Sequence, residues 1–277
     1  MVETVNDKME LKKLRKKIFI TGYKGGVAHL ASCFSALEIL YALYLKEVLR
    51  IDKNNPKWSE RDRFVLSKGH AGLALYCVLN EAGLISDEMY NSYLQENSLI
   101  GGEPCVRDCE WIEATTGSLG HGMPMAVGMA MALKMNSSAA RVYVLVGDGE
   151  CEEGTTWEAA MNASRYGLDN LVVILDSNKL QKMEAVEDTI GVPRWQEKWS
   201  GFGFEVSEVD GHDVEAVVEA LAEVPFCGKP HLVIAHTTKG KGVSIMEGRP
   251  SWHFKLPGKR EQKVFMEELE ITDQELE

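Results

Sequence analysis

The sequence lacks the features that mark membrane, secreted and nucleic-acid-binding proteins. It has no run of about 18 consecutive apolar residues, the length that a membrane-spanning helix needs. Its basic start from Lys8 to Lys17 is interrupted by leucines at helical spacing, and no signal-peptide core follows. It also lacks an excess of positive charge, since its formal net charge is −12. We therefore expect a cytoplasmic protein with no membrane and no nucleic-acid partner.

Cysteine pairs and nucleotide-binding loops are also missing. The six cysteines contain no CxxC spacing, which in an acidic chain of 277 residues is typical of reduced thiols. Cys105 and Cys109 lie close together, but no His or Cys pair at zinc-ligand spacing accompanies them. The segment Gly201-Phe-Gly203 lacks the third glycine of a dinucleotide fingerprint, and Lys239-Gly-Lys-Gly242 lacks the spacing of a P-loop. Zinc and nucleotide sites are therefore disfavoured.

The second half of the chain alternates between strand and helix patterns. Short apolar runs, each typical of a buried strand, cover Arg141–Val146, Leu171–Leu175, Phe204–Val209 and His231–His236. Helical patterns lie between them, one of them opened by Asp213 as an N-cap. Such alternation predicts right-handed crossovers and an α/β fold, with a mostly parallel sheet flanked by helices.

The first part of the chain has helical spacing throughout. The helical patterns cover Met9–Phe19, Phe34–Leu49 and Gly72–Glu81. No linker separates them from the rest, so we expect a single domain over residues 1–277 with a helical region at about 1–100. The acidic tail after Glu267 is expected to be a frayed end.

The segment Gly147-Asp148-Gly149 carries the clearest chemical signal. It ends an apolar run, and Asn178 follows the next run thirty residues later. A crossover of this length returns the chain to the neighbouring strand, so Asn178 would face Asp148 at the carboxyl edge of the sheet. A carboxylate, an amide oxygen and a backbone carbonyl would form half of an octahedral Mg²⁺ shell. The alternative is an ordinary turn followed by solvated acids at Glu150, Glu152 and Glu153.

The spacing from this tripeptide to Asn178-Lys-Leu-Gln181 resembles the thiamine diphosphate fold of the transketolase family. The resemblance covers nearly the whole chain and extends to Ser67-Lys-Gly-His-Ala71, Thr115-Thr-Gly-Ser-Leu-Gly120, Gly154 to Ala163, Val209-Asp-Gly-His-Asp213, Thr238 to Val243 and Trp252-His253. It implies thiamine diphosphate as cofactor, together with Mg²⁺ or, in its place, Ca²⁺ or Mn²⁺.

The resemblance also implies roles for single residues. Asp148 and Asn178 would bind the metal through their side chains, and Leu180 through its carbonyl. The other implied contacts are Gly147 and Gly149 with the diphosphate, Gly117 and Leu119 with the aminopyrimidine, His29, His70 and His253 along the thiazolium and substrate channel, and Glu153 between the cofactor sites of two subunits. For each histidine, the alternative is a structural role.

Transketolases build each active site from two units, and this chain ends before the second. The second unit carries the glutamate that activates the aminopyrimidine. The resemblance therefore implies a separate pyrimidine-domain subunit, commonly in an α₂β₂ assembly, and an enzyme that is inactive without it. Its reaction would move a two-carbon unit from a donor to an aldehyde acceptor, with the carbanion chemistry supplied by the cofactor.

Two departures from the family pattern leave the donor open. The loop His29-Leu-Ala-Ser32 is more like deoxyxylulose-phosphate synthase, and Glu103 stands where transketolases place a histidine that contacts the donor. The donor is therefore a ketose phosphate or a 2-oxo acid such as pyruvate. Glu103 would contact the substrate, turn away toward Arg107, or lie on the surface of a rebuilt loop.

Two further functions belong to other classes. A non-catalytic cofactor-binding subunit would need neither Asp148 nor Asn178, so the intact pair favours an enzyme. The α chain of a 2-oxo-acid dehydrogenase shares the cofactor motif, but it lacks counterparts of Ser67–Ala71 and Trp252-His253.

Overall fold

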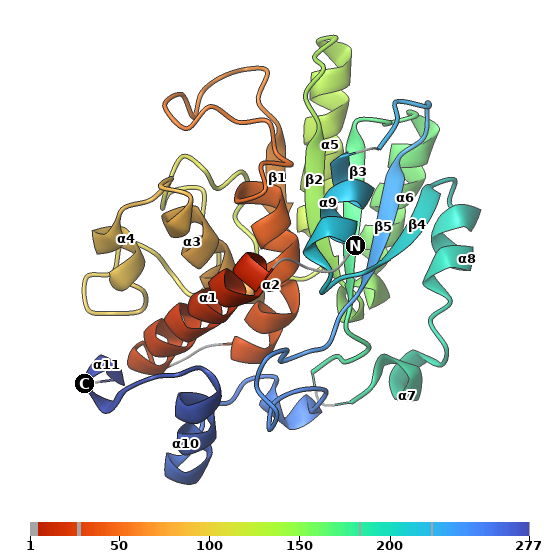
Figure 1. Cartoon of the computed structure of the whole chain (residues 1–277). Coiled ribbons are helices and arrows are strands. Elements are labelled where there is room, and N and C mark those ends of the chain that lie inside the picture. Colours follow the sequence, from red (N-terminus) through yellow and green to blue (C-terminus); the bar gives the residue numbers. More distant parts are fainter. Residues whose placement is uncertain (1–4, 27–28, 183, 223, 277) are drawn as a thin grey trace.

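A five-stranded parallel sheet forms the centre of the molecule (Figure 1). The computed structural model describes residues 5–26, 29–182, 184–222 and 224–276. The strand order is β1-β2-β3-β5-β4, and every neighbouring pair is parallel. The strands are β1 (Arg63–Leu66), β2 (Val142–Gly147), β3 (Leu171–Ser177), β4 (Glu205–Asp210) and β5 (His231–His236). The predicted α/β class is thereby confirmed.

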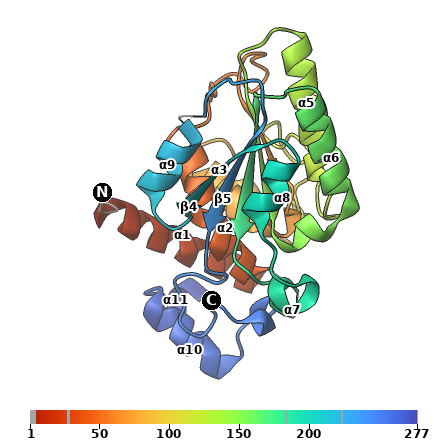
Figure 2. The ribbon, with the colours of Figure 1, turned by 90° about the vertical axis from the view of Figure 1, so that its right-hand side faces the viewer.

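Helices cover both faces of the sheet, as Figure 2 shows. One layer contains α1 (Val5–Lys24), α2 (Leu30–Tyr44), α3 (Gly72–Glu81) and α9 (Val214–Ala222). The other contains α5 (Gly122–Met135), α6 (Gly154–Arg165) and α8 (Trp195–Gly201). The shorter elements are α4 (Asp87–Asn91), α7 (Val186–Ile190), α10 (Lys259–Glu268), α11 (Asp273–Leu276) and the 3₁₀ turns η1 (Gly69–Ala71), η2 (Gly149–Glu152) and η3 (Pro250–Trp252). None of the described helices is both long and apolar enough to cross a membrane.

Alternate residues of the central strands serve the two layers. In β2, Tyr143 and Leu145 pack with α1, α2, α3 and α9, whereas Val142 and Val144 pack with α5, α6 and α8. Both faces of the strand are therefore buried, and a strand buried on both faces must be apolar along its length. This is the physical reason for the continuous apolar runs in the sequence.

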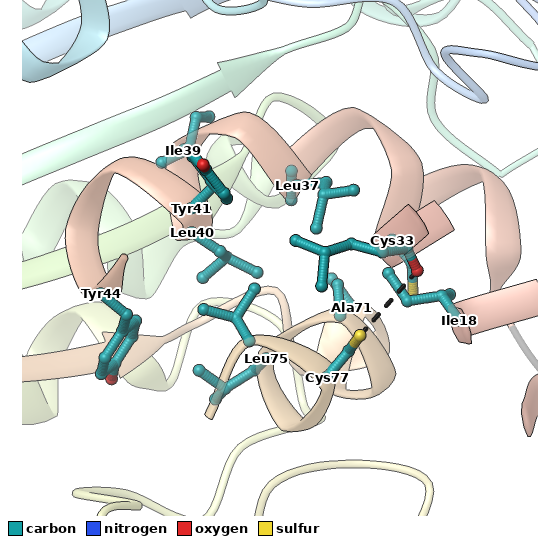
Figure 3. Close-up of a cluster of buried hydrophobic side chains, with 14 of the residues drawn as sticks. Ile18, Cys33, Leu37, Ile39, Leu40, Tyr41, Tyr44, Ala71, Leu75 and Cys77 are labelled. Carbon is teal, nitrogen blue, oxygen red and sulfur yellow. Dashed lines mark hydrogen bonds between the residues drawn. The ribbon is translucent and has the colours of Figure 1, made fainter. Parts of the chain in front are cut away.

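Helix α2 is buried along its whole length, between the sheet and the helices α1 and α3. Figure 3 shows Leu40 of α2 and Leu75 of α3 among the side chains that meet there. Cys33 and Cys77 belong to the same cluster, and all six cysteines are free, as their spacing predicts. Because α2 is fixed on every side, His29 at its N-cap position is held firmly near the carboxyl edge of the sheet.

Two expectations for the first part of the chain are wrong in detail. It is not wholly helical, because β1 pairs with β2 at the edge of the sheet. Four residues that include a charged Arg63 are too short a run to stand out as a strand. Helix α2 also ends at Tyr44 instead of Leu49, since Leu49 turns back and donates its N–H to the carbonyl of Leu43.

The acidic tail is ordered, contrary to the prediction of a frayed end. Phe265 of α10 stacks on Phe19 of α1, with 4.6 Å between ring centroids. Leu269 and Ile271 are buried, and Glu275 accepts an ion pair from Lys16 at 2.7 Å. The segment after Glu267 therefore covers part of α1.

Candidate active site

The candidate site lies at the carboxyl edge of the sheet, where β2 and β3 end side by side. Gly147, the last residue of β2, is in register with Asp176 of β3. Asp148 and Asn178 follow these strands, and the backbone N–H of Lys179 donates to Asp148 Oδ2 at 2.6 Å. The two loops therefore meet, as the order of parallel strands predicts.

All residues assigned a role from the sequence line one cavity of about 350 Å³, which we call the central cavity. They are His29, His70, Glu103, Gly117, Leu119, Gly147, Asp148, Gly149, Glu153, Asn178, Leu180 and His253. These residues come from seven separate segments of the chain. Their convergence is a finding, while their individual roles stay predictions.

Asp148 is the carboxylate best placed for a cation. It is only 2% exposed, and burial together with the nearby Asp176 raises its pKa to about 7. A divalent cation beside Asp148 would reverse this shift by stabilising the ionised form. The described residues contain no group of three His, Cys, Asp or Glu side chains that could hold a metal. A cation here would therefore need neutral protein oxygens and ligand oxygens as well.

The sequence interpretation missed a buried ion pair under the cavity. Lys68 follows β1 and pairs with Asp176 at the end of β3, and both side chains are at most 1% exposed. Asp176 also accepts hydrogen bonds from Ser35 Oγ at 2.7 Å and from Thr237 Oγ1. Burial alone would raise the pKa of Asp176, but the Lys68 ammonium outweighs it and lowers that pKa. The pair therefore stays ionised.

Lys239 is a second buried cation that the sequence interpretation missed. It is 3% exposed and follows β5 within the Thr238 to Val243 segment. Its Nζ lies 3.1 Å from Nδ1 of His253 and 3.4 Å from the carbonyl oxygen of Leu180. Burial and the nearby Lys68 lower the pKa of Lys239 to about 8. An anion in the cavity would relieve this proximity of two positive charges.

Glu150 joins three loops around the cavity. Its carboxylate accepts hydrogen bonds from the N–H of Gly120 at 2.9 Å, from the N–H of Gly147 at 3.1 Å and from Ser67 Oγ. Burial raises its pKa. The alternative of a solvated acid is therefore wrong for Glu150, whereas Glu153 is exposed at the rim.

Three histidines form a cluster on the opposite side of the cavity. The ring centroid of His29 lies 5.2 Å from those of both His70 and His253. Burial, followed by Lys239, lowers the pKa of His29 to about 4 and that of His253 to about 3; burial also lowers the pKa of His70. All three are neutral near pH 7, so each ring can donate one hydrogen bond and accept another.

The residues present fit an anionic ligand of diphosphate type held with a divalent cation. Lys68 and Lys239 supply buried positive charge, and Asp148 supplies the cation ligand. Ser32 Oγ is buried in the same cavity and has no hydrogen-bond partner within the described part of the chain. A Cβ at Gly147 would meet no atom closer than 3.9 Å, so this glycine leaves open space. An orphaned hydroxyl and two buried ammonium groups are donors that a polyanion requires.

A larger cavity of about 750 Å³ lies next to the central one. It shares Asp148, Asn178, Leu180 and Lys239 with the central cavity but continues toward Trp195 and His236. The histidine cluster and the glycines of the predicted site line only the central cavity among the two. We therefore place the chemistry there.

Comparison with known proteins places these features in a family. Residues 19–272 match the family model described as transketolase, thiamine diphosphate binding domain. One of the two subunits named for apulose-4-phosphate transketolase, from Actinobacillus succinogenes, is 42% identical over 93% of this chain and 94% of its own. The 6-deoxy-6-sulfo-D-fructose transketolase subunit SqwG from Clostridium sp. is 39% identical over 83% of this chain and 84% of its own.

A solved structure gives the same result for the fold. Transketolase from Campylobacter jejuni superposes on 94% of this chain with a TM-score of 0.84 and 30% identity. This chain spans only 42% of that transketolase chain.

Proposed function

Since the chain belongs to the transketolase family of thiamine diphosphate-binding domains, we propose that it is the cofactor-binding subunit of a two-chain transketolase. It matches the apulose-4-phosphate transketolase relative over nearly the whole length of both chains, but less than half of a one-chain transketolase. In this proposal the pyrimidine domain is a separate subunit, and the two form an α₂β₂ assembly. The reaction moves a two-carbon unit from a donor sugar to an aldehyde.

The observation that carries the proposal is the convergence of the cation-binding and anion-binding groups in the central cavity. Asp148, Asn178 and the carbonyl of Leu180 would hold Mg²⁺ at one end, beside the buried Lys68 and Lys239. Mg²⁺ prefers oxygen ligands and is commonly shared between carboxylates and substrate phosphates. The two lysines would then balance the remaining negative charge of the diphosphate.

The histidines would handle the oxygens of the sugar. Thiamine diphosphate supplies the carbanion chemistry when it is bound. The neutral rings of His29, His70 and His253 can donate to a carbonyl or hydroxyl oxygen and can accept a hydroxyl proton. Their low pKa values keep the accepting nitrogen free above about pH 5, which suits proton transfer near neutral pH.

The exposed rim of the cavity supports a partner subunit. Phe254 is 56% exposed although its ring lies 4.7 Å from that of His29 at the cavity mouth. Glu153 is exposed on the same rim, consistent with a role between two cofactor sites. Large exposed apolar side chains next to a catalytic cavity are typical of surfaces that another chain covers.

The sugar donor is supported by the names of the two relatives. One acts on apulose 4-phosphate and the other on 6-deoxy-6-sulfo-D-fructose, according to their names. We propose that this subunit likewise serves a sugar donor in preference to pyruvate.

Reconstitution tests the proposal. The chain is purified alone and together with a pyrimidine-domain subunit, and each sample is assayed with thiamine diphosphate, Mg²⁺, a ketose phosphate and an aldehyde. We expect two-carbon transfer only from the pair, and cofactor binding by calorimetry in both samples. Transfer by the isolated chain would contradict the two-subunit proposal, and absence of transfer by the pair with any donor would contradict the enzymatic one.

A further inference from the structure

Glu103 lies at the boundary between two cavities. It lines the central cavity and also an outer cavity of about 380 Å³, bounded by His29, Tyr93, Leu94 and Phe254. His29 is the other side chain shared by both. A molecule that enters the central cavity from the outer one therefore passes between Glu103 and the histidine cluster.

The backbone around Glu103 is held rigidly. Its carbonyl oxygen accepts a hydrogen bond from the Tyr76 hydroxyl at 3.1 Å, and the next carbonyl, of Pro104, accepts one from the N–H of Thr116 at 3.1 Å. This segment packs closely on α3, because a Cβ at Gly72 would lie 3.1 Å from the carbonyl oxygen of Gly102. The position of Glu103 is thus set by the fold and not by a loose loop.

The protein leaves room for the Glu103 carboxylate but gives it no partner. A Cβ at Gly117 would lie 1.9 Å from Oε2 of Glu103, and Gly117 has a φ of +141°, which favours glycine. Among the residues that the structure describes, no cation lies within ion-pair distance of the carboxylate and no group donates to it, Arg107 included. Asp148 and Glu150, by contrast, both accept backbone hydrogen bonds. Burial raises the pKa of Glu103.

We propose that Glu103 selects the donor, accepting a hydrogen bond from a hydroxyl of the sugar and excluding donors with a carboxylate at the reacting end. The inference rests on the proposed function and names the class of donor for the same site: polyhydroxylated ketoses and not 2-oxo acids.

The charge of the surroundings supports this selection. An ionised carboxylate accepts hydrogen bonds and cannot donate them, so hydroxyl groups are its natural partners. A 2-oxo acid would bring a second carboxylate toward it, and like charges near each other in a partly desolvated cavity repel. No lysine or arginine is among the described residues that line the outer cavity. That cavity therefore suits the uncharged, hydroxylated part of a sugar, and a phosphate group must bind elsewhere.

The test compares donors in the reconstituted pair. Wild type, Glu103→Gln and the control Glu110→Gln are assayed with xylulose 5-phosphate and with pyruvate, each with the same aldehyde. Gln keeps the size of the side chain but removes the charge. Glu110 belongs to the same segment, is exposed and pairs with Lys57 at 3.1 Å, outside both cavities. Calorimetry of thiamine diphosphate binding and circular dichroism confirm that each variant is folded and loaded.

We expect wild type to prefer the ketose. In Glu103→Gln, kcat/KM for the ketose should fall by about tenfold, mainly through KM, because a hydrogen bond to a charged group is lost. The preference over pyruvate should fall at least as much, while Glu110→Gln should match wild type. An unchanged ratio in a loaded, active Glu103→Gln pair overturns the role of Glu103 and leaves the proposed function standing. Wild type that prefers pyruvate also overturns it, and a wild-type pair that transfers no two-carbon unit overturns both proposals.

Discussion

The two ends of the central cavity are built in different ways. At the end formed by Lys68, Asp148, Asp176 and Lys239, which we call the charged end, every side chain is almost fully buried and linked to its neighbours. At the end formed by the three histidines and Glu103, the side chains are partly exposed and touch mostly through rings or not at all. The charged end is complete within one chain, whereas the other is open.

This difference separates binding from selection. A polyanion with a cation needs fixed charges in a desolvated place, and burying such charges requires partners that the fold itself supplies. A substrate that must enter and leave needs groups whose hydrogen-bonding capacity is free. The charged end is therefore suited to retain a ligand, and the histidine end to exchange one.

The largest expected effect is the loss of ligand retention at the charged end. In Asp148→Ala, affinity for thiamine diphosphate in the presence of Mg²⁺ should fall by more than about 100-fold, because loss of a direct ligand exceeds loss of an outer-shell partner. Calorimetry measures this, with Glu158→Ala on the exposed face of α6 as control. Undiminished affinity in a folded Asp148→Ala protein would remove Asp148 from the metal site.

Breaking the buried ion pair should destabilise the fold. Lys68→Met leaves Asp176 charged and unpaired, and we expect a loss of about 3–5 kcal/mol in the free energy of unfolding. Urea denaturation measures it. Lys13→Met, which breaks the exposed pair with Glu81, should cost no more than about 1 kcal/mol. Equal effects of the two changes would contradict the contrast between buried and exposed charge.

Acidification should act on the histidine end. The unfolded imidazoles protonate near pH 6.5, but folded His29 and His253 protonate only near pH 4 and 3. Their contribution to stability is complete above pH 6.5 and is lost progressively as pH falls toward 4. The free energy of unfolding should therefore drop less from pH 7 to pH 5 in His29→Gln/His253→Gln than in wild type. Asp148 acts with the opposite sign, because its raised pKa stabilises the fold as pH falls below 7.

The smallest expected effect concerns the support of Glu103. Tyr76→Phe removes the hydroxyl that donates to the Glu103 carbonyl, at a cost of about 1 kcal/mol in stability. Donor preference should shift in the same direction as in Glu103→Gln but by less. A larger shift than that of Glu103→Gln itself would mean that Tyr76 acts on the donor directly.

The cation-binding loops could be predicted because they depend on strand order. Two successive strands joined by one crossover lie side by side, and their carboxyl ends carry Asp148 and Asn178 to the same place. The histidines could be assigned only through family resemblance, because nothing in their spacing shows that His29 and His253 approach within 5.2 Å.

The buried charges could not be predicted in the same way. Lys and Glu are exposed in most proteins, so Lys68 and Glu150 carry no local sign of burial. Asp176 carried a weak sign, because it ends an apolar run that the sheet buries on both faces. Its partner Lys68 is more than a hundred residues away, and only the pairing of β1, β2 and β3 brings the two together.

The stacking of Phe19 on Phe265 has a consequence for synthesis on the ribosome. Helix α1 leaves the exit tunnel first, yet part of its apolar face is covered by a helix translated roughly 250 residues later. At ~5–20 residues per second, α1 waits about 12–50 seconds for that cover. During this interval Phe19 is open to chaperones and to neighbouring nascent chains. The newly made subunit is therefore most vulnerable to aggregation just before α10 emerges.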